Sequence, residues 1–236
     1  MLNKNKNKAL TFSYDDGVIQ DIRLIEIFNK YGLKATFNLN SGLLGKPGEL
    51  LRNGVYVNHT KVNAEDVKHI YEGHEVAVHT IIHPVLQEKT DEEIMRQVEI
   101  DREKLSNLVG YEVKGMAYPC CAPDERVIKV VKENTGVKYS RSPNVTYNYT
   151  PSEEMFNYHG TVYHHEDWDR LFEIGEKFLK IEEEAPQIMY VWGHAYEFDI
   201  YPERWQQFEE FCEMISKRND IFYGTNIQAF EKFGLV

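Results

Sequence analysis

The sequence has little that would build a disulfide framework or a membrane anchor. Its 236 residues include three cysteines, and an odd count in which Cys120 and Cys121 are neighbours suits disulfides poorly. No segment approaches the run of about 18 apolar residues that a transmembrane helix needs. The Asn-Lys repeats in residues 1–8 are not followed by the apolar stretch of a signal peptide, so we expect a flexible N-terminal tail there. These absences favour a reducing, cytoplasmic setting and no membrane partner.

An excess of positive charge is also missing. Lys and Arg number 27 against 38 Asp and Glu, which gives a net charge of -11 at pH 7. Phosphate backbones are bound by clustered Lys and Arg, so we expect no nucleic-acid partner. A chain of this length with 42% hydrophobic residues can bury a sizeable core, and we expect one domain over residues 9–236.

Strand-like and helix-like segments alternate along the chain. The strand-like segments lie at 9–14, 34–39, 75–78, 112–117, 137–140, 187–192 and 221–224. Helical patterns lie at 20–31, 64–72, 91–109, 124–134, 167–181, 203–217 and 228–233, with Asn63, Thr90 and Asp167 as cap candidates and Gly32 and Gly110 as stop signals. The alternation predicts an α/β fold, an irregular or incomplete (β/α) barrel with about seven parallel strands. An open doubly wound sheet is the alternative, although no glycine-rich nucleotide turn follows the first strand.

Residues that can do chemistry follow several of these strands. Asp15 and Asp16 end the first strand, His79 follows the third, and His194 follows the strand at 187–192. In (β/α) barrels the working residues sit at the carboxyl ends of the strands, so these side chains are expected to meet at one rim.

The Asp15-Asp16-Gly17 segment has two interpretations. Asp and Gly are common in turns and Asp caps helices, so the segment could be purely structural. It follows an apolar strand, however, and two buried carboxylates without a cation are costly. On the functional interpretation one carboxylate binds a metal and the other acts as a base.

His79 and His83 are four residues apart, which would place both on one face of a helical turn. Two exposed or capping histidines are the alternative. One carboxylate and two imidazoles leave positions open for water and substrate, as a catalytic zinc or another borderline divalent ion requires.

Two motifs resemble those of the polysaccharide deacetylase family, also called the NodB-homology family or carbohydrate esterase family 4. Residues 13–17, S-Y-D-D-G, resemble its T-F-D-D-G motif, and residues 73–84, G-H-E-V-A-V-H-T-I-I-H-P, resemble G-H-E-I-x-x-H-[ST]-x-x-H-P. The resemblance extends from about residue 9 to His194. It implies that Asp15 is the catalytic base and His194 the general acid. It also implies that Asp16, His79 and His83 hold a divalent metal, with zinc expected and cobalt, nickel or manganese as alternatives.

The third motif departs from the family pattern. The family has R-x-P-Y-G or A-Y-P-Y-G, whereas residues 117–121 read A-Y-P-C-C. By resemblance the Cys120 backbone N–H stabilises the oxyanion, and a main-chain donor survives the change of side chain. Tyr118 is a candidate substrate-binding residue. Cys120 and Cys121 are expected to be small buried residues that fill space, with reactive thiols as the alternative.

Three further side chains have open interpretations. Arg141 is either a surface arginine or a substitute for the missing motif arginine, reaching the Asp15 region and the substrate from its own strand end. Trp192 is either a wall of the acetyl-binding pocket or plain core. The family's fourth motif, an Asp that orients the catalytic histidine, has its only nearby candidate in Asp167-Trp168-Asp169, and Asp167 serves equally well as a helix cap. His164 and His165 are expected to be incidental, and His59 has no evident partner.

Together these features predict a metal-dependent carbohydrate N-deacetylase. It would hydrolyse the N-acetyl group of an amino sugar or N-acetylated saccharide and release acetate. An amidase acting on another small or cyclic amide is one alternative. A metal-binding or sugar-binding protein without catalysis is the other, although binding alone needs neither Asp15 nor His194.

Overall fold

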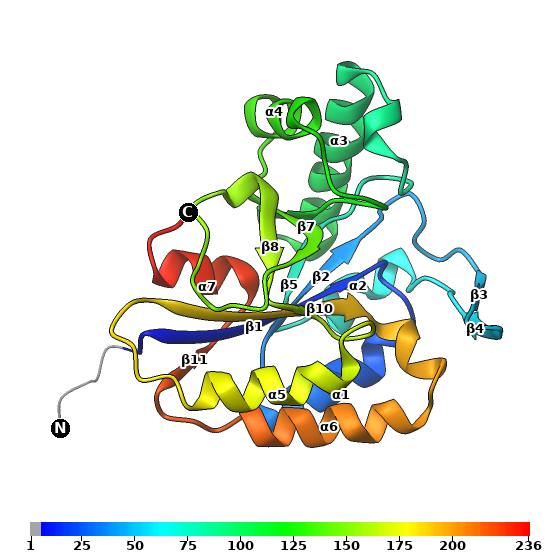
Figure 1. Ribbon diagram of the computed structural model, residues 1–236. Coiled ribbons are helices and arrows are strands. Elements are labelled where there is room, and N and C mark those ends of the chain that lie inside the picture. The colour runs from blue at the N-terminus through cyan, green and yellow to red at the C-terminus, as the bar shows by residue number, and fades with distance from the viewer. Residues whose placement is uncertain (1–5) are drawn as a thin grey trace.

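The computed structural model describes residues 6–236 and is built around a nine-stranded sheet (Figure 1). Its strand order is β8-β7-β6-β5-β2-β1-β10-β9, and β11 pairs with β1. The strands are β1 (Lys8–Asp15), β2 (Ala35–Leu39), β5 (Glu75–Val78), β6 (Gly115–Ala117), β7 (Tyr139–Val145), β8 (Tyr158–Gly160), β9 (Val162–Tyr163), β10 (Gln187–His194) and β11 (Ile221–Tyr223). All pairings in this sheet are parallel.

The predicted α/β class and incomplete barrel are confirmed. The seven expected strands are present, and β8 and β9 are short additions at the two ends of the strand order. The order does not close on itself, because the sheet ends at β8 on one side and at β9 on the other. Residues 1–5, most of the tail expected over residues 1–8, lie outside the described residues, and Lys8 already opens β1.

Helices cover the sheet on its outer sides. They are α1 (Asp21–Tyr31), α2 (Val67–Ile70), α3 (Asp91–Val109), α4 (Glu125–Asn134), α5 (Trp168–Leu179), α6 (Glu203–Ile215) and α7 (Asn226–Lys232). In Figure 1, α1, α5 and α6 lie together below the sheet, while α3 and α4 lie together above it. Short 3-10 helices are η1 (Ala64–Asp66), η2 (Leu86–Glu88), η3 (Met155–Asn157) and η4 (Ala195–Asp199). None of the helices in residues 6–236 is long and apolar enough to cross a membrane.

Local capping signals explain some helix ends and not others. Thr90 accepts a hydrogen bond from the Glu93 N–H at the start of α3, and Gly110 ends that helix in the left-handed conformation. Asn63 and Asp167 occupy the expected N-cap positions of η1 and α5, but neither side chain accepts a capping hydrogen bond there. The helix expected at 64–72 is divided into η1 and the single turn α2.

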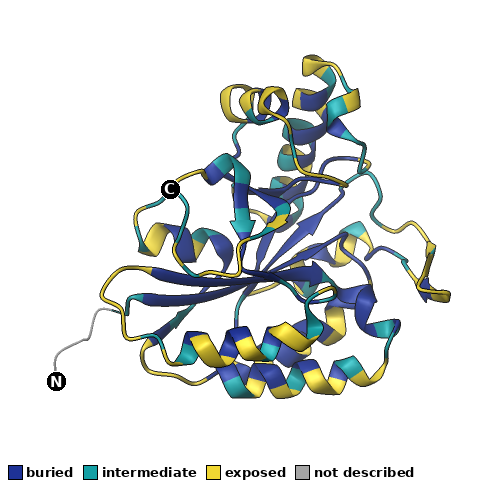
Figure 2. Cartoon of the chain, viewed as in Figure 1, coloured by how far each residue is buried: buried dark blue, intermediate teal, exposed yellow. Residues whose placement is uncertain are grey.

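The core lies where helices pack on the sheet. Every residue of β1 is buried, because β1 is paired on one side with β10 and on the other with β2 and β11. Aromatic rings fill the space between β1, α1 and α6, for example Phe12, Phe28 and Phe208. Figure 2 shows buried strands and helices whose exposed residues face outward. A central, fully buried β1 gives the residues at its carboxyl end a rigid support.

A two-stranded hairpin projects beside the carboxyl end of the sheet (Figure 1). It consists of β3 (Glu49–Arg52) and β4 (Val55–Asn58), which pair antiparallel. The sequence patterns did not predict this hairpin, because its strands are short and mostly exposed and therefore lack a clear apolar alternation.

Candidate metal centre and active site

A cavity of about 570 Å³ opens at the carboxyl ends of the central strands. Nine of the residues singled out in the sequence line it, namely Asp15, Asp16, His79, His83, Tyr118, Cys120, Arg141, Trp192 and His194, whereas Cys121 and Asp167 do not. Parallel strands present their carboxyl ends at the same edge, so residues far apart in the chain meet here. The register places Asp15 of β1 directly beside His194 of β10.

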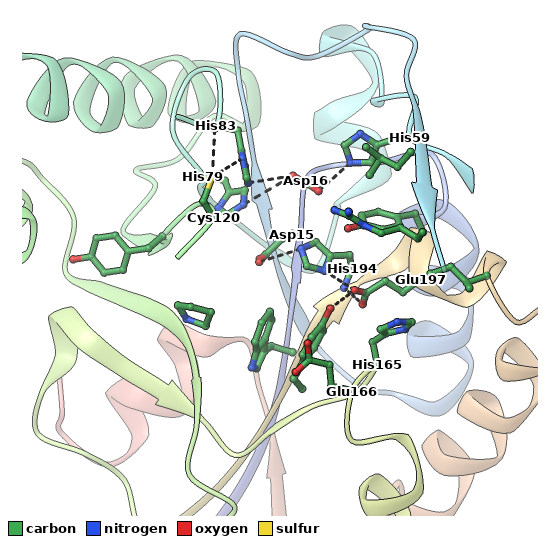
Figure 3. A pocket seen from close by; sticks show the side chains of 18 of the residues that line it. Asp15, Asp16, His59, His79, His83, Cys120, His165, Glu166, His194 and Glu197 are labelled. Atoms are coloured by element: carbon green, nitrogen blue, oxygen red, sulfur yellow. Dashed lines mark hydrogen bonds and ion pairs between the residues drawn. The ribbon is translucent and has the colours of Figure 1, made fainter. Parts of the chain in front are cut away.

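Asp16, His79 and His83 form a candidate metal centre, since one ligand atom from each lies within 4.8 Å of the others (Figure 3). Asp16 Oδ1 is 4.0 Å from His79 Nε2 and 3.8 Å from His83 Nε2. His79 Nδ1 lies 2.8 Å from the Ala117 carbonyl oxygen, so it carries the proton and Nε2 has its lone pair toward Asp16. The donor set is therefore one carboxylate oxygen and two imidazole nitrogens, which suits zinc or a similar dication.

Protonation at this centre also fits a cation. Burial lowers the pKa of His79 to about 4 and lowers that of His83 as well, so both rings are neutral at pH 7. Burial raises the pKa of Asp16, but a hydrogen bond from His59 and the charge of Lys61 outweigh it and hold the pKa well below its usual value. Neutral imidazoles and an ionised carboxylate are the forms that bind metal.

The two histidines do not share a helical turn, so that part of the expectation is wrong. His79 follows β5 and leads into a loop in which Thr80 and His83 have left-handed backbones, with φ of 68° and 58°. The Asn40 side chain holds this loop by donating to the His79 and Thr80 carbonyl oxygens at 2.6 and 2.9 Å. The chain reversal, and not helical periodicity, brings the two rings to a centroid distance of 4.7 Å.

Strained backbone recurs around the cavity. Asp16 and Cys120 also have positive φ, at 84° and 65°. Such conformations cost energy in residues other than glycine and concentrate at functional sites. Gly17 follows Asp16 with φ of 61°, where any other residue would be strained, and a Cβ there would also push against the Leu39 side chain at 2.7 Å.

His59 has a partner that the sequence did not reveal. Its Nε2 lies 3.0 Å from Asp16 Oδ2, the carboxylate oxygen on the other side from the histidine pair (Figure 3). Lys61 Nζ lies 3.5 Å from Asp16 Oδ1. Both residues follow β4, so the unpredicted hairpin connection brings two polar side chains to the candidate metal ligand.

Asp15 is held by two side chains, one from the adjacent strand β2 and one from the more distant strand β7. Arg141 Nη2 donates to Asp15 Oδ2, and Asn38 Nδ2 donates to Oδ1 at 2.7 Å. Burial raises the pKa of Asp15, but the charge and hydrogen bond of Arg141 and the charge of His194 outweigh it and keep the pKa below its ordinary value. Asp15 is therefore an anion that faces the cavity without belonging to the candidate ligand set.

Arg141 is 1% exposed, so its interpretation as a surface arginine is wrong. The register pairs Arg141 of β7 with Ala117 of β6, which occupies the usual arginine position of the third motif. The guanidinium thus reaches Asp15 from the strand next to β6. It also lies 4.3 Å from the centroid of the Trp192 ring.

The residue that orients His194 is Glu197, and the sequence reasoning missed it. His194 Nδ1 lies 3.0 Å from Glu197 Oε1, and His194 Nε2 lies 4.0 Å from Asp15 Oδ2 (Figure 3). Asp167, the expected candidate, instead accepts a hydrogen bond from the Tyr147 hydroxyl. The available signal was the three-residue spacing from His194 to Glu197, which forms a capping box at η4.

Glu197 also binds a second buried histidine. Its Oε2 lies 3.1 Å from His164 Nε2, and His164 Nδ1 lies 2.9 Å from the Tyr14 hydroxyl. The expectation that His164 is incidental is therefore wrong, because the ring ties Glu197 to Tyr14 near the carboxyl end of β1. Burial lowers the pKa of His194, but the charge and hydrogen bond of Glu197 and the charges of Asp16 and Asp15 raise it to about 9.

The two neighbouring cysteines are exposed, so their interpretation as buried filling residues is wrong. Cys120 Sγ lies 3.5 Å from His83 Nδ1 at the cavity wall. Within residues 6–236 the Cys120 backbone N–H makes no hydrogen bond to the protein. A free main-chain donor is thus present where the resemblance implies one.

Aromatic side chains also line the cavity. Trp192 is buried and stacks on Tyr163 with ring centroids 4.1 Å apart. Tyr118 lines the cavity and donates from its hydroxyl to the Phe156 carbonyl oxygen at 2.9 Å. These rings contribute apolar surface to a cavity otherwise lined by charged and polar side chains.

Comparison with solved structures shows the same fold. The Xyl-CE4 domain of a multidomain xylanase from the hindgut metagenome of Trinervitermes trinervoides is 17% identical with a TM-score of 0.60, over 96% of this chain and 92% of that one. A mutant of the peptidoglycan deacetylase PdaC from Bacillus subtilis is 16% identical with a TM-score of 0.58, over 97% and 93%. A CE4 family pseudoenzyme from Bacillus anthracis is 16% identical with a TM-score of 0.59, over 96% and 67%.

At the level of sequence, no curated protein matches the chain. A family model does match: residues 2–140 fit the polysaccharide deacetylase model, and they contain Asp15, Asp16, His79 and His83. That match covers more than half of the chain and agrees with the fold of the solved structures. The chain therefore belongs to the polysaccharide deacetylase family.

Proposed function

We propose that this protein is a divalent-metal-dependent hydrolase that removes N-acetyl groups from an amino sugar or N-acetylated saccharide and releases acetate. The observation that carries the proposal is the division of the site into two halves. Asp16, His79 and His83 form a set of metal ligands, while Asp15 and His194 lie beside it, 4.0 Å apart, outside that set. Family membership supports deacetylation, since other deacetylases have this fold.

In this proposal Asp16, His79 and His83 hold the metal, with zinc expected and cobalt, nickel or manganese as alternatives. A dication bound there would polarise the acetyl carbonyl and lower the pKa of water. The lone pair at His79 Nε2 and the ionised Asp16 fit this role, as described above.

The chain's own residues then move protons around the acetyl group. Asp15, kept ionised by Arg141, takes the proton of the attacking water. The Cys120 N–H donates to the oxygen that gains negative charge. His194, kept protonated by Glu197, gives its proton to the departing sugar amine. Trp192, Tyr118 and Arg141 line the place where the substrate would lie.

The direct test measures acetate release from N-acetylglucosamine oligomers together with the metal content of the protein. We expect turnover with metal bound, and loss of both metal and turnover in His79→Ala. Turnover only on small or cyclic amides would favour the amidase alternative, which the A-Y-P-C-C motif keeps open. Metal binding without hydrolysis of either substrate class would favour a catalytically inactive protein.

Replacing Glu197 should change the pH dependence of the reaction. His194 must be protonated to act as an acid, so in the wild type kcat/KM falls as the pH rises through about 9. Glu197→Gln removes the charge that raises the pKa of His194. The high-pH limb of the profile, where kcat/KM falls, should therefore move to lower pH, and kcat should fall about tenfold. The measurement is kcat/KM from pH 6 to 10, with Asp167→Asn as a control that leaves the limb in place. An unchanged limb in Glu197→Gln would remove Glu197 from this role.

A further inference from the structure

Each of the two neighbouring carboxylates in the cavity lies beside a positively charged side chain. Asp15 and Asp16 are 3% and 8% exposed, and a buried carboxylate without a positive partner is costly. Arg141 pairs with Asp15. For Asp16 the corresponding group is Lys61, whose Nζ lies 3.5 Å from Oδ1. The protein alone therefore supplies one positive group for each carboxylate.

Lys61 is built into this position. It is 6% exposed, which is rare for a lysine unless it is paired. Its backbone forms an isolated bridge with Val18, and the adjacent Val62 N–H donates to the Gly17 carbonyl oxygen at 3.0 Å. The segment that carries Lys61 is thus bound to the turn that carries Asp16. The ammonium group is held over the carboxylate and does not reach it from a mobile surface chain.

The two carboxylate oxygens of Asp16 have different partners, because His59 binds one of them. Its Nε2 lies 3.0 Å from Oδ2, so it carries a proton and donates it there. Lys61 Nζ lies 3.2 Å from the same nitrogen, but a protonated Nε2 has no lone pair to accept from the ammonium. The hydrogens of Lys61 are therefore left for Oδ1. His59 holds one oxygen and leaves the other to face Lys61 and the two histidines.

The oxygen that faces Lys61 is also the candidate metal ligand, because Oδ1 lies 3.8 Å from His83 Nε2 and 4.0 Å from His79 Nε2. A dication and an ammonium that share one carboxylate oxygen repel each other. We propose that Lys61 supplies the positive charge of this site when no metal is bound and thereby lowers its affinity for a dication. His59 is a positioning residue that turns Oδ1 toward the metal. The inference rests on the proposed metal site and adds that the metal is held reversibly.

The test is zinc binding to metal-free protein by calorimetry, compared between wild type and Lys61→Met. Methionine keeps the length and apolar stem of lysine but removes the charge, so we expect zinc to bind about tenfold more tightly. Lys61→Arg keeps the charge and should bind zinc like the wild type. The unfolding temperature of metal-free Lys61→Met should fall, and zinc should raise it by more than in the wild type.

Substitution of His59 should change zinc affinity in the opposite direction. His59→Phe removes the donor to Oδ2 and should weaken zinc binding by about tenfold, as loss of a hydrogen bond to a metal ligand does. His59→Gln retains an N–H donor and should restore most of the affinity. The opposite signs at positions 59 and 61 separate these roles from a general loss of structure, which would weaken binding in both.

The outcomes also separate this inference from the proposed function. Zinc affinity in Lys61→Met that is unchanged or weaker, with wild type binding zinc, would overturn the role of Lys61 alone. Zinc binding that follows the expected pattern in a protein that releases no acetate would overturn the deacetylase and leave the role of Lys61 supported. A wild type that binds no zinc, cobalt, nickel or manganese would overturn both.

Discussion

Asp15→Asn should lower kcat by about 10³-fold while the protein keeps its metal. The substitution preserves the shape of the side chain and its contact with Asn38, but it removes the group that accepts the water proton, and a positioned general base contributes about 10²–10⁴ to the rate. Asp15 lies outside the Asp16, His79 and His83 set. Zinc affinity, measured by calorimetry, should therefore stay within about threefold of wild type.

The comparison with Asp16→Asn makes this test specific. Both variants remove one buried negative charge from the same turn, but only Asp16→Asn should release the metal. Full activity of metal-loaded Asp15→Asn would show that another group takes the proton. Equal metal loss in both variants would show that the two carboxylates do not have separate roles.

Arg141→Met should cause the largest loss of stability among the substitutions at this site. Arg141 and Asp15 have side-chain exposures of 1% and 4%, and removing one partner of a buried ion pair costs about 3–5 kcal/mol. Asp15 would then lie buried without its cation, so its pKa should rise above the usual value. A higher pKa leaves less of the carboxylate ionised, so Asp15 would accept a proton from water less well. Urea unfolding and acetate release measure the two effects.

The pH dependence of the free energy of unfolding tests the Arg141–Asp15 ion pair more specifically. In the wild type the pKa of Asp15 is lower in the folded protein than in the unfolded chain, where it is near 3.8. This difference stabilises the folded protein at pH values above 3.8, and the stabilisation is lost as the pH falls through the pKa of the folded protein. In Arg141→Met the raised pKa reverses the sign, so acidification toward pH 5 should stabilise the variant relative to pH 8. Adding Asp15→Asn should recover most of the lost stability and none of the activity.

A matched control is available on the surface. Arg126 donates to Asp91 at 2.7 Å, but both side chains are exposed. Arg126→Met should therefore cost less than about 1 kcal/mol and leave activity unchanged. Equal losses at positions 126 and 141 would mean that burial of the Asp15 pair has no energetic consequence.

The fold could be inferred from the sequence because segments of buried, mainly apolar strand alternate with amphipathic helices along the chain. Their order along the chain indicates parallel pairing, and β1, β2, β5, β6, β7, β10 and β11 all lie close to the expected positions. The β3–β4 hairpin and the short β8 and β9 were missed. The strands of the hairpin are mostly exposed, so they lack an apolar pattern, and β8 and β9 have only three and two residues.

For the site too, residues close together in the sequence could be predicted, whereas contacts between distant residues were harder to predict. Asp15, Asp16, His79 and His83 were recognisable because each pair lies within one short stretch of chain. Their distant partners were harder to identify. Arg141, 126 residues from Asp15, was placed near it in only one of two interpretations, and nothing near Asp16 indicated His59, which is 43 residues away.

Strand order and register, together with the connection after β4, bring these side chains to one end of the sheet. Pairing of β6 with β7 places Arg141 next to Ala117, and pairing of β1 with β10 places His194 next to Asp15. The amino-acid sequence was enough to indicate which groups could bind a metal and move a proton, because ligand type and close spacing are local properties. Tertiary structure alone decided which cation holds each carboxylate and which carboxylate holds His194. Those choices depend on which strand ends and loops lie side by side in a barrel that does not close.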